Sequence, residues 1–360
     1  MKFLKILIIM VVTVTSCSLF AWWDLGHFLT ARVAQINLSR VAEKKVEACL
    51  NYTIKYPPAP RRDFKQPKNM VNSATWLDGI KGGQWNLDSK DKDKFSNIHF
   101  SSMYYDVDSE VDNLEVAKEK VLVERVLTKY NSLQATESSI KSLVKPGTSK
   151  VEQAVALRTL IHLLGDIHCP MHSIDPTIDD IGTWGGNGIY LDGDKIKFED
   201  LNGELTNITN MHKLWDGMGA AYKNVPYPVT EINYDYLDEI ANELNQSFKD
   251  ETSADVNLWA AKTLILGEMA STSQEVDYRR LRLKDEKDFD IIKKWEGEYS
   301  LFAKNISKQQ VYLGGKRLGG ILMAIYDPDN AQPKYKQLVN KIRDDKKIPT
   351  LEEYMNFKFR

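Results

Sequence analysis

Two histidine–carboxylate pairs with the same spacing are the clearest chemical signal in this sequence. His162 and Asp166 lie four residues apart in a stretch with helical periodicity, and His212 and Asp216 repeat that spacing. Side chains four residues apart lie one turn apart on the same face of a helix. Imidazole and carboxylate groups placed in this way can bind one metal ion, and zinc uses both kinds of ligand. A single such pair is more often a surface hydrogen bond, but two pairs in a chain with six histidines favour metal binding.

Three further residues could complete such a site. His172 follows Pro170, which must end the preceding helix, and a ligand just beyond a helix end can reach a second ion. His99 lies among apolar and aromatic neighbours and could equally be a buried core histidine. Asp78 follows an apolar pair, and a lone aspartate in such a place is more often a helix cap. His168 receives no ligand role, and we expect it in an exposed loop.

The elements that must position these residues are helices, and the periodicity predicts an all-α fold. Apolar residues recur at helical steps in the segments 28–51, 111–129, 151–164, 236–248, 258–272, 284–303 and 308–326. The strand signal is limited to a short hairpin near 189–198 that turns at Asp192-Gly193. We expect one mainly helical domain with long loops at 22–326, followed by a polar C-terminal tail at 327–360.

The composition excludes several classes of protein. The chain has 360 residues, with 48 basic against 50 acidic side chains and a formal net charge of -2. A hydrophobic content of 42% fits a globular protein and does not fit collagen, a disordered acidic chain or a multi-span membrane protein. The lack of net positive charge argues against a basic duplex-DNA-binding protein. Three cysteines are too few for a disulfide scaffold, although Cys49 and Cys169 could pair in an oxidising compartment.

The first 21 residues are typical of a secretory signal peptide. Lys2 and Lys5 precede an apolar run, and small residues follow it up to Ala21. Cleavage after Ala21 would make Trp22 the N-terminal residue, whereas the alternative is a lipoprotein anchored at Cys17. No later stretch is apolar enough to span a membrane. We therefore expect a secreted or periplasmic monomer.

In order along the chain, several segments resemble the S1/P1 family of zinc-dependent single-strand nucleases, which shares the fold of zinc phospholipase C. They are 22–27, 74–78, 98–100, 160–172, 185–187, 210–216 and 313–322. Five of the six histidines fall on ligand positions of that family. The chain departs from the family at Cys169, where the family usually has glutamine, and at Ser102, near the position where some members have a base-reading carboxylate. The segment 216–306 is also longer than expected. These departures leave the base preference open.

The resemblance implies three Zn²⁺ ions and assigns their ligands. The first ion would be held by Asp78, His99, His162 and Asp166, the second by His172, His212 and Asp216, and the third by His27, Asp166 and the α-amine and carbonyl of Trp22. Asp166 would bridge the first and third ions. Two zinc ions that share a ligand can lower the pKa of a water between them from about 15.7 toward 7. Three such ions also give a slightly acidic protein the positive charge that a polyanion requires.

The resemblance further implies hydrolysis of single-stranded DNA and RNA to products with a 5′-phosphate, and removal of the 3′-phosphate from nucleotides. Asp78 and Asp166 would serve the metal-dependent chemistry, and Lys81 is placed to contact a phosphate, although it could be an ordinary surface lysine. Phe100 could stack on an unpaired base or pack in the core. Asn187 could order the site or simply form a turn.

Two other functions remain open at this point. A zinc phospholipase C would have a similar site, but that family spaces its N-terminal tryptophan further from its first histidine and tends to have glutamate in place of Asp216. A secreted zinc-binding protein without catalysis is the second alternative. Structural zinc sites are closed and usually rich in cysteine, which argues against it.

Overall fold

The computed structural model describes residues 23–54, 66–81, 87–106, 113–178, 181–189, 191, 196–249, 253–272 and 298–359. The α-helices among them are α1 (Asp24–Ile36), α2 (Arg40–Leu50), α3 (Met70–Ser73), α4 (Trp76–Gly79), α5 (Ser89–Asn97), α6 (Leu114–Leu127), α7 (Ser132–Val144), α8 (Lys150–Asp166), α9 (Pro170–Ser173), α10 (Met211–Asp216), α11 (Glu231–Ser247), α12 (Val256–Thr272), α13 (Glu298–Tyr326), α14 (Pro333–Asp344) and α15 (Leu351–Met355). Two 3₁₀ turns are Met218–Ala220 and Pro328–Asn330. The strands are β1 (Met103–Asp106), β2 (Ile174–Ile178), β3 (Ile181–Gly182), β4 (Lys197–Glu199) and β5 (Leu205–Asn207). The predicted all-α class is confirmed.

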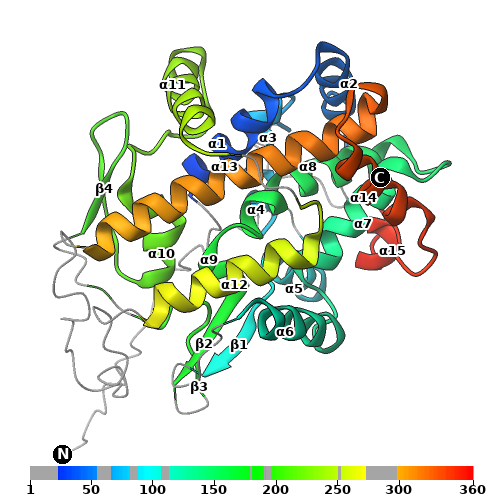
Figure 1. Ribbon diagram of the computed structural model, residues 1–360. Helices are drawn as coiled ribbons and strands as arrows, with labels where there is room; N and C mark the ends of the chain where they lie inside the picture. Colours follow the sequence, from blue (N-terminus) through cyan, green and yellow to red (C-terminus); the bar gives the residue numbers. More distant parts are fainter. Residues whose placement is uncertain are drawn as a thin grey trace, which may run out of the picture.

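The long helix α13 crosses the molecule and packs on both α1 and α8 (Figure 1). Two glycines allow this close approach. A Cβ atom at Gly314 would lie 2.8 Å from the Leu164 carbonyl oxygen of α8, and one at Gly315 would lie 2.6 Å from the Val33 side chain of α1. Helices α1 and α8 carry His27, His162 and Asp166, so α13 fixes the two helices that supply much of the candidate site.

Most of the predicted helices are present, with different bounds. The predicted helix 28–51 is two helices, because the chain turns after α1 and Ser39 caps α2 by accepting a hydrogen bond from the Ala42 amide. The predicted segment 308–326 is the C-terminal part of α13, which begins at Glu298. Residues 284–297 of the predicted helix 284–303 lie outside the described residues.

Helix α7 was not predicted from the sequence. Asn131 caps it by accepting from the Gln134 amide, and it packs against α8. The buried positions of α7 include small polar residues such as Ser138, Ser139 and Ser142. Buried serines weaken the apolar periodicity by which a helix is recognised in a sequence, which explains the omission.

A small sheet, which the sequence did not predict, brings two parts of the candidate site together. Strand β1 pairs in parallel with β2, with Met103 opposite Ile174, and β2 pairs antiparallel with β3. The pairing continues before the strands, where the Ser101 amide donates to the His172 carbonyl oxygen at 2.9 Å. The segment that carries His99 therefore runs alongside the segment that carries His172.

The predicted hairpin near 189–198 is displaced along the chain. The antiparallel pair is β4 with β5, with Phe198 opposite Thr206, so the turn lies between Glu199 and Leu205. The predicted turn at Asp192-Gly193 lies outside the described residues. Among the described residues, no helix is long and apolar enough to cross a membrane.

The segment 327–360, expected to be a polar tail, is folded onto the domain. Helix α14 buries Tyr335, Leu338 and Ile342, and α15 buries Leu351 and Met355. Both helices lie beside α7 (Figure 1). The apolar residues of α14 recur at helical steps, but lysines and aspartates surround them, and the high average polarity of the segment led to the prediction of a tail.

Candidate metal centre

Helix α8 supplies the two residues at the centre of the site. Ser149 caps the helix by accepting from the Glu152 amide, and the helix ends at Asp166, before Pro170 begins α9. His162 and Asp166 therefore project from consecutive turns, and both are fully buried. Asp166 Oδ2 lies 3.1 Å from His162 Nε2. The predicted pairing of these two side chains on one helix face is confirmed.

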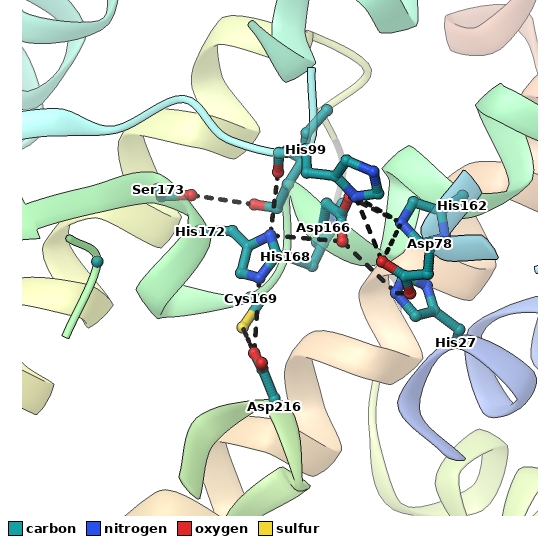
Figure 2. Close-up of polar contacts among 12 residues, drawn as sticks. His27, Asp78, His99, His162, Asp166, His168, Cys169, His172, Ser173 and Asp216 are labelled. Atoms are coloured by element: carbon teal, nitrogen blue, oxygen red, sulfur yellow. Dashed lines mark hydrogen bonds and ion pairs between the residues drawn. The ribbon is translucent and has the colours of Figure 1, made fainter. Parts of the chain in front are cut away.

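The Asp166 carboxylate is shared by histidines from several segments (Figure 2). Besides the contact with His162, Oδ2 lies 3.1 Å from His99 Nδ1. The other oxygen, Oδ1, lies 3.5 Å from His27 Nε2 and 3.5 Å from His172 Nδ1. One carboxylate therefore faces imidazoles on two sides.

Asp78 adds a second carboxylate from the short helix α4. It lies inside the helix, is 3% exposed and does not act as a cap. Its Oδ1 lies 3.7 Å from His99 Nδ1 and 3.9 Å from His162 Nε2, and its Oδ2 lies 3.9 Å from His27 Nε2. Two sets of potential metal ligands result, each with its ligand atoms within 4.8 Å of one another: His27, His162 and Asp166, and Asp78, His99 and His162.

A further group surrounds Asp216 at the end of α10. Asp216 Oδ1 lies 3.5 Å from His172 Nε2, and Oδ2 lies 3.3 Å from His212 Nε2. The rings of His172 and His212 stack with their centroids 5.0 Å apart. Cys169 Sγ lies 3.7 Å from Asp216 Oδ1, and Cys169, His172 and Asp216 form a third set with ligand atoms within 4.8 Å.

Backbone carbonyl groups orient three of these imidazoles. The Nδ1–H group donates from His162 to Ala74 at 2.6 Å, from His172 to His99 at 3.0 Å and from His212 to Gly185 at 2.7 Å. Donation from Nδ1 leaves the Nε2 lone pair directed at the carboxylates. Metal-binding histidines are held in this way by a partner for the other ring nitrogen.

The loop that supplies the Gly185 carbonyl is itself held by a buried carboxylate. Asp175 Oδ1 accepts from the Gly185 amide at 3.0 Å and from the Thr183 hydroxyl at 3.5 Å. Gly185 has a φ of +61°, and a Cβ atom there would lie 2.7 Å from the Met171 carbonyl oxygen. Only glycine fits this position, which is what lets the loop reach His212.

Burial raises the pKa of each carboxylic acid in the site. For Asp78 it raises the pKa to about 7, with the nearby His162 opposing the shift. Burial also raises the pKa of Asp166, and it raises that of Asp216 well above the usual range. The positive charge supplied by the protein itself is therefore too small to stabilise the ionised form of these three buried carboxylates.

The histidines are mostly held neutral. Burial, assisted by the other nearby cationic groups, lowers the pKa values of His27, His99 and His172 well below 6.5. His162 differs, because burial lowers its pKa but neighbouring carboxylates, Asp166 first among them, raise it by more. Neutral imidazole is the form that binds a metal.

The polar atoms at the centre of the site fit metal ions. Several are buried and have no hydrogen-bond partner among the described residues: Nδ1 and Nε2 of His27, Oδ1 of Asp78, Nε2 of His99, Oδ1 of Asp166 and Nε2 of His172. Buried polar atoms are almost always paired, so a cluster of exceptions requires an explanation. Zinc binds imidazole nitrogen and carboxylate oxygen, so cations among these groups would give both kinds of atom a partner. These buried groups could therefore hold metal ions.

Comparison with known proteins agrees with this chemistry. A sequence model of the S1/P1 nuclease family matches residues 22–327. The chain belongs to the S1/P1 nuclease family. Endonuclease 3 of Arabidopsis thaliana is 25% identical over 254 residues, which cover 70% of this chain and 70% of that protein. The protein is therefore a hydrolase that acts on phosphodiester bonds, with nucleic acid as its substrate.

Lys81 and Phe100 lie beside the buried histidines and carboxylates of the nuclease. Lys81 Nζ is buried, has no hydrogen-bond partner among the described residues and lies 4.6 Å from the centroid of the Phe100 ring. The Phe100 ring is partly buried and lies 4.6 Å, centroid to centroid, from His172. Asn187 lies in the turn after Gly186, where its Nδ2 donates to the Trp184 carbonyl at 2.8 Å.

His168 is not in an exposed loop, as the sequence had suggested, but fully buried. Its Nδ1–H donates to the Leu164 carbonyl at 2.7 Å, and its Nε2 accepts from Arg317 of α13. The last turn of α8 lies directly under α13 at Gly314, where a Cβ atom would approach the His168 ring to 3.4 Å. Only the tertiary packing of the nuclease buries this residue.

Trp22 lies outside the described residues. The next residue, Trp23, donates its amide to the Asp216 carbonyl oxygen at 2.8 Å. The start of the described chain is therefore tied to the group around Asp216.

Two residues of the site were missed by sequence reasoning. The sequence marks Cys169 as a disulfide candidate and as a departure from the family, but not as a site residue; both Cys49 and Cys169 are free thiols, so the suggested pair does not form. Cys169 and His172 are separated by two residues, a spacing that pairs of cysteine ligands use in zinc sites, and this could have pointed to a sulfur ligand. Asp175 carries no comparable signal, because its role depends on a loop that folds back from ten residues downstream.

Proposed function

We propose that the protein is an exported, trinuclear-zinc phosphodiesterase. Its substrates would be single-stranded DNA and RNA, cleaved to products with a 5′-phosphate, and 3′-nucleotides, from which it would remove the phosphate. The observation that carries the proposal is the position of Asp166. Its two oxygens face different histidines, at 3.1 Å from His99 and at 3.5 Å from His27, so this carboxylate can serve two ions at once.

The proposed ligands follow the grouping of the buried side chains. One ion would be held by Asp78, His99, His162 and Asp166, a second by His172, His212 and Asp216, and a third by His27, Asp166 and the α-amine and carbonyl of Trp22. The short contact between Trp23 and Asp216 supports a place for the N-terminus near this centre. The α-amine would be available only after removal of residues 1–21, which is why the proposal includes export.

Bound zinc supplies Lewis acidity and lowers the pKa of water at neutral pH, and two ions can stabilise the attacking and leaving oxygens of a phosphodiester. The protein contributes a dry, rigid frame, because its ligands are buried and three of its histidines are fixed by backbone carbonyls. Asp166 and Asp78 would supply the anionic charge that holds the metal ions together. Rigid placement of charge avoids reorganisation during the reaction.

Lys81 and Phe100 are proposed to contact substrate. The Lys81 ammonium has no fixed hydrogen-bond partner among the described residues, so it can bind a phosphate oxygen without breaking an existing contact. It lies over the Phe100 ring, and its movement to a phosphate would uncover that face for an incoming base. A base can stack there only when it is unpaired, which would favour single strands. Asn187 would steady the adjoining turn.

A panel of four substrates tests this function directly. Exported protein is incubated with an end-labelled single-stranded oligonucleotide, the same sequence as a duplex, a 3′-nucleotide and phosphatidylcholine vesicles. We expect cleavage of the single strand and of the 3′-nucleotide, loss of both activities with a chelator, and recovery on addition of zinc. Hydrolysis of phosphatidylcholine alone would identify a phospholipase C. Zinc binding without turnover of any substrate would identify a non-catalytic zinc-binding protein.

A further inference from the structure

We propose that Cys169 is an additional metal ligand, which would give the group around Asp216 a sulfur donor. The proposal concerns one ligand only and rests on the proposed metal centre. The site would then combine two imidazoles, one carboxylate and one thiolate. The observations that carry it are the position of the sulfur, an unpaired nitrogen beside it and the local chain geometry.

The sulfur atom lies where a ligand to this group must lie. Cys169 is fully buried, and its Sγ is 3.7 Å from Asp216 Oδ1. The same oxygen is 3.5 Å from His172 Nε2. Sγ, a ring nitrogen of His172 and a carboxylate oxygen of Asp216 all lie within 4.8 Å of one another, and Figure 2 shows the three side chains converging. A zinc ion bound by sulfur at about 2.3 Å and nitrogen at about 2.0 Å requires ligand atoms separated by distances of this order.

A buried ring nitrogen without a hydrogen bond also indicates an ion at this place. His172 is 1% exposed, and its Nε2 has no hydrogen-bond partner among the described residues. Its Nδ1 donates to the His99 carbonyl, so the ring cannot turn to find another partner for Nε2 without losing that bond. The nitrogen is therefore held facing the carboxylate and the thiol.

The chain between the two residues is built to keep them on one side. Pro170 is the first residue of α9, and the His172 amide closes the turn by donating to the Cys169 carbonyl oxygen at 3.0 Å. This turn keeps residues 169 and 172 close together. Two intervening residues also commonly separate a pair of cysteine ligands in zinc sites, so the spacing is compatible with binding to one ion.

A sulfur ligand would change which metal this group prefers. Thiolate is a soft donor and favours soft ions, whereas carboxylate and imidazole alone do not discriminate as strongly. Four protein donors also complete a tetrahedral shell, so an ion here would contact substrate only by accepting a fifth ligand. In the absence of ligation, the thiol would instead act only as a hydrogen-bond donor to Asp216.

Cobalt substitution distinguishes a sulfur ligand from a hydrogen-bond donor. Exported protein is freed of metal and titrated with Co²⁺, and the near-ultraviolet absorption is recorded. We expect a sulfur-to-cobalt charge-transfer band that is retained in Cys49→Ser and absent in Cys169→Ser. Cys49 is the matched control because it is a free, partly buried thiol on α2, away in sequence from the proposed metal ligands. The serine at 169 preserves a hydrogen-bond donor, so it removes only the sulfur.

Affinity measurements give a second readout. Cys169→Ser should weaken Cd²⁺ binding by at least about 10–100-fold, which is the typical effect of removing a residue that only orients a metal ligand. It should weaken Cd²⁺ binding more than Zn²⁺ binding. If Cys169→Ser fails to fold, the charge-transfer band in Cys49→Ser still assigns the sulfur, since Cys169 is then the thiol available in protein that begins at Trp22.

The outcomes separate this inference from the proposed function. Cobalt binding without a sulfur band, with equal Cd²⁺ affinities in wild type and Cys169→Ser, would show that the thiol is not a ligand and would leave the metal centre standing. Failure of both proteins to bind Co²⁺ and Zn²⁺ would overturn the metal centre itself, and this inference with it.

Discussion

Replacing Asp166 by asparagine should remove most of the nuclease activity while leaving the fold in place. The amide has nearly the same shape as the carboxylate and fits the fully buried position. It lacks the charge and the second anionic oxygen that allow Asp166 to face His27 and His99 together. The variant therefore tests a shared ligand, and it does not create a cavity.

The size of the loss follows from what the carboxylate contacts. Removing one preorganised stabilising group from an active site typically costs about 2.7–4 kcal/mol, or roughly 10²–10³ in kcat. Asp166 borders two groups of ligands, so we expect the upper end, about 10³. An ion present at 100 times its Kd stabilises the folded protein by about 2.7 kcal/mol, so weakened binding of two ions should lower the Tm by roughly 10 °C in the presence of zinc. With a chelator present, the two proteins should melt at similar temperatures, because burial already disfavours the ionised Asp166.

Three measurements on the same samples decide the outcome: initial rates on a single-stranded oligonucleotide, bound zinc by mass spectrometry, and melting with and without chelator. Glu152→Gln is the matched control. Glu152 is a buried carboxylate of the same helix that accepts from the Ser142 hydroxyl at 2.7 Å and lies outside the metal ligands. It should keep its zinc and its kcat even if its stability falls. Near-normal turnover of Asp166→Asn with full metal content would refute the shared-ligand reasoning.

Three other expectations follow from the same site. Phe100→Ala should raise KM on single strands more than it lowers kcat, since a stacked base contributes about 1–3 kcal/mol; equal KM values for wild type and variant would place the ring in the core. One extra residue before Trp22 should lower the zinc content from three toward two and abolish most phosphodiesterase activity without unfolding the protein. The reason is that an amide nitrogen cannot replace the α-amine as a zinc ligand. A fully active protein that begins at Cys17 and holds three zinc ions would contradict this. Zinc affinity should fall as the pH is lowered through about 7, because protonated Asp78 must release its proton to bind metal. His27 and His99 stay neutral in this pH range. A zinc affinity independent of pH, measured by competitive chelator titration, would exclude this coupling.

Much of the candidate site could be predicted from sequence because its information is local. The four-residue spacing of His162 and Asp166 places them on one helix face wherever the helix lies, and Pro170 marks where that helix ends. The same reasoning located His212 and Asp216 on α10. The helices with apolar periodicity were predicted for the same reason, apart from their ends.

The remainder depends on contacts between distant segments. Nothing local to residue 99 indicates that β1 pairs with β2 and brings His99 beside His172. His168 is buried by α13, which lies about 150 residues further along the chain. Helix α7 buries several small polar side chains, and α14 and α15 lie in a segment of low average hydrophobicity, so neither feature marked them as helices of the domain. Local propensity is overridden in such places by tertiary structure.

The number of zinc ions in active, exported protein tests the central claim most directly. The protein is purified after natural processing, its N-terminal residue is identified, and zinc is counted by mass spectrometry on the same sample that is assayed against single-stranded DNA. We predict Trp22 as the first residue, three zinc ions per chain and loss of cleavage in step with their removal. Full cleavage activity in protein that holds one zinc ion or none would contradict the trinuclear site.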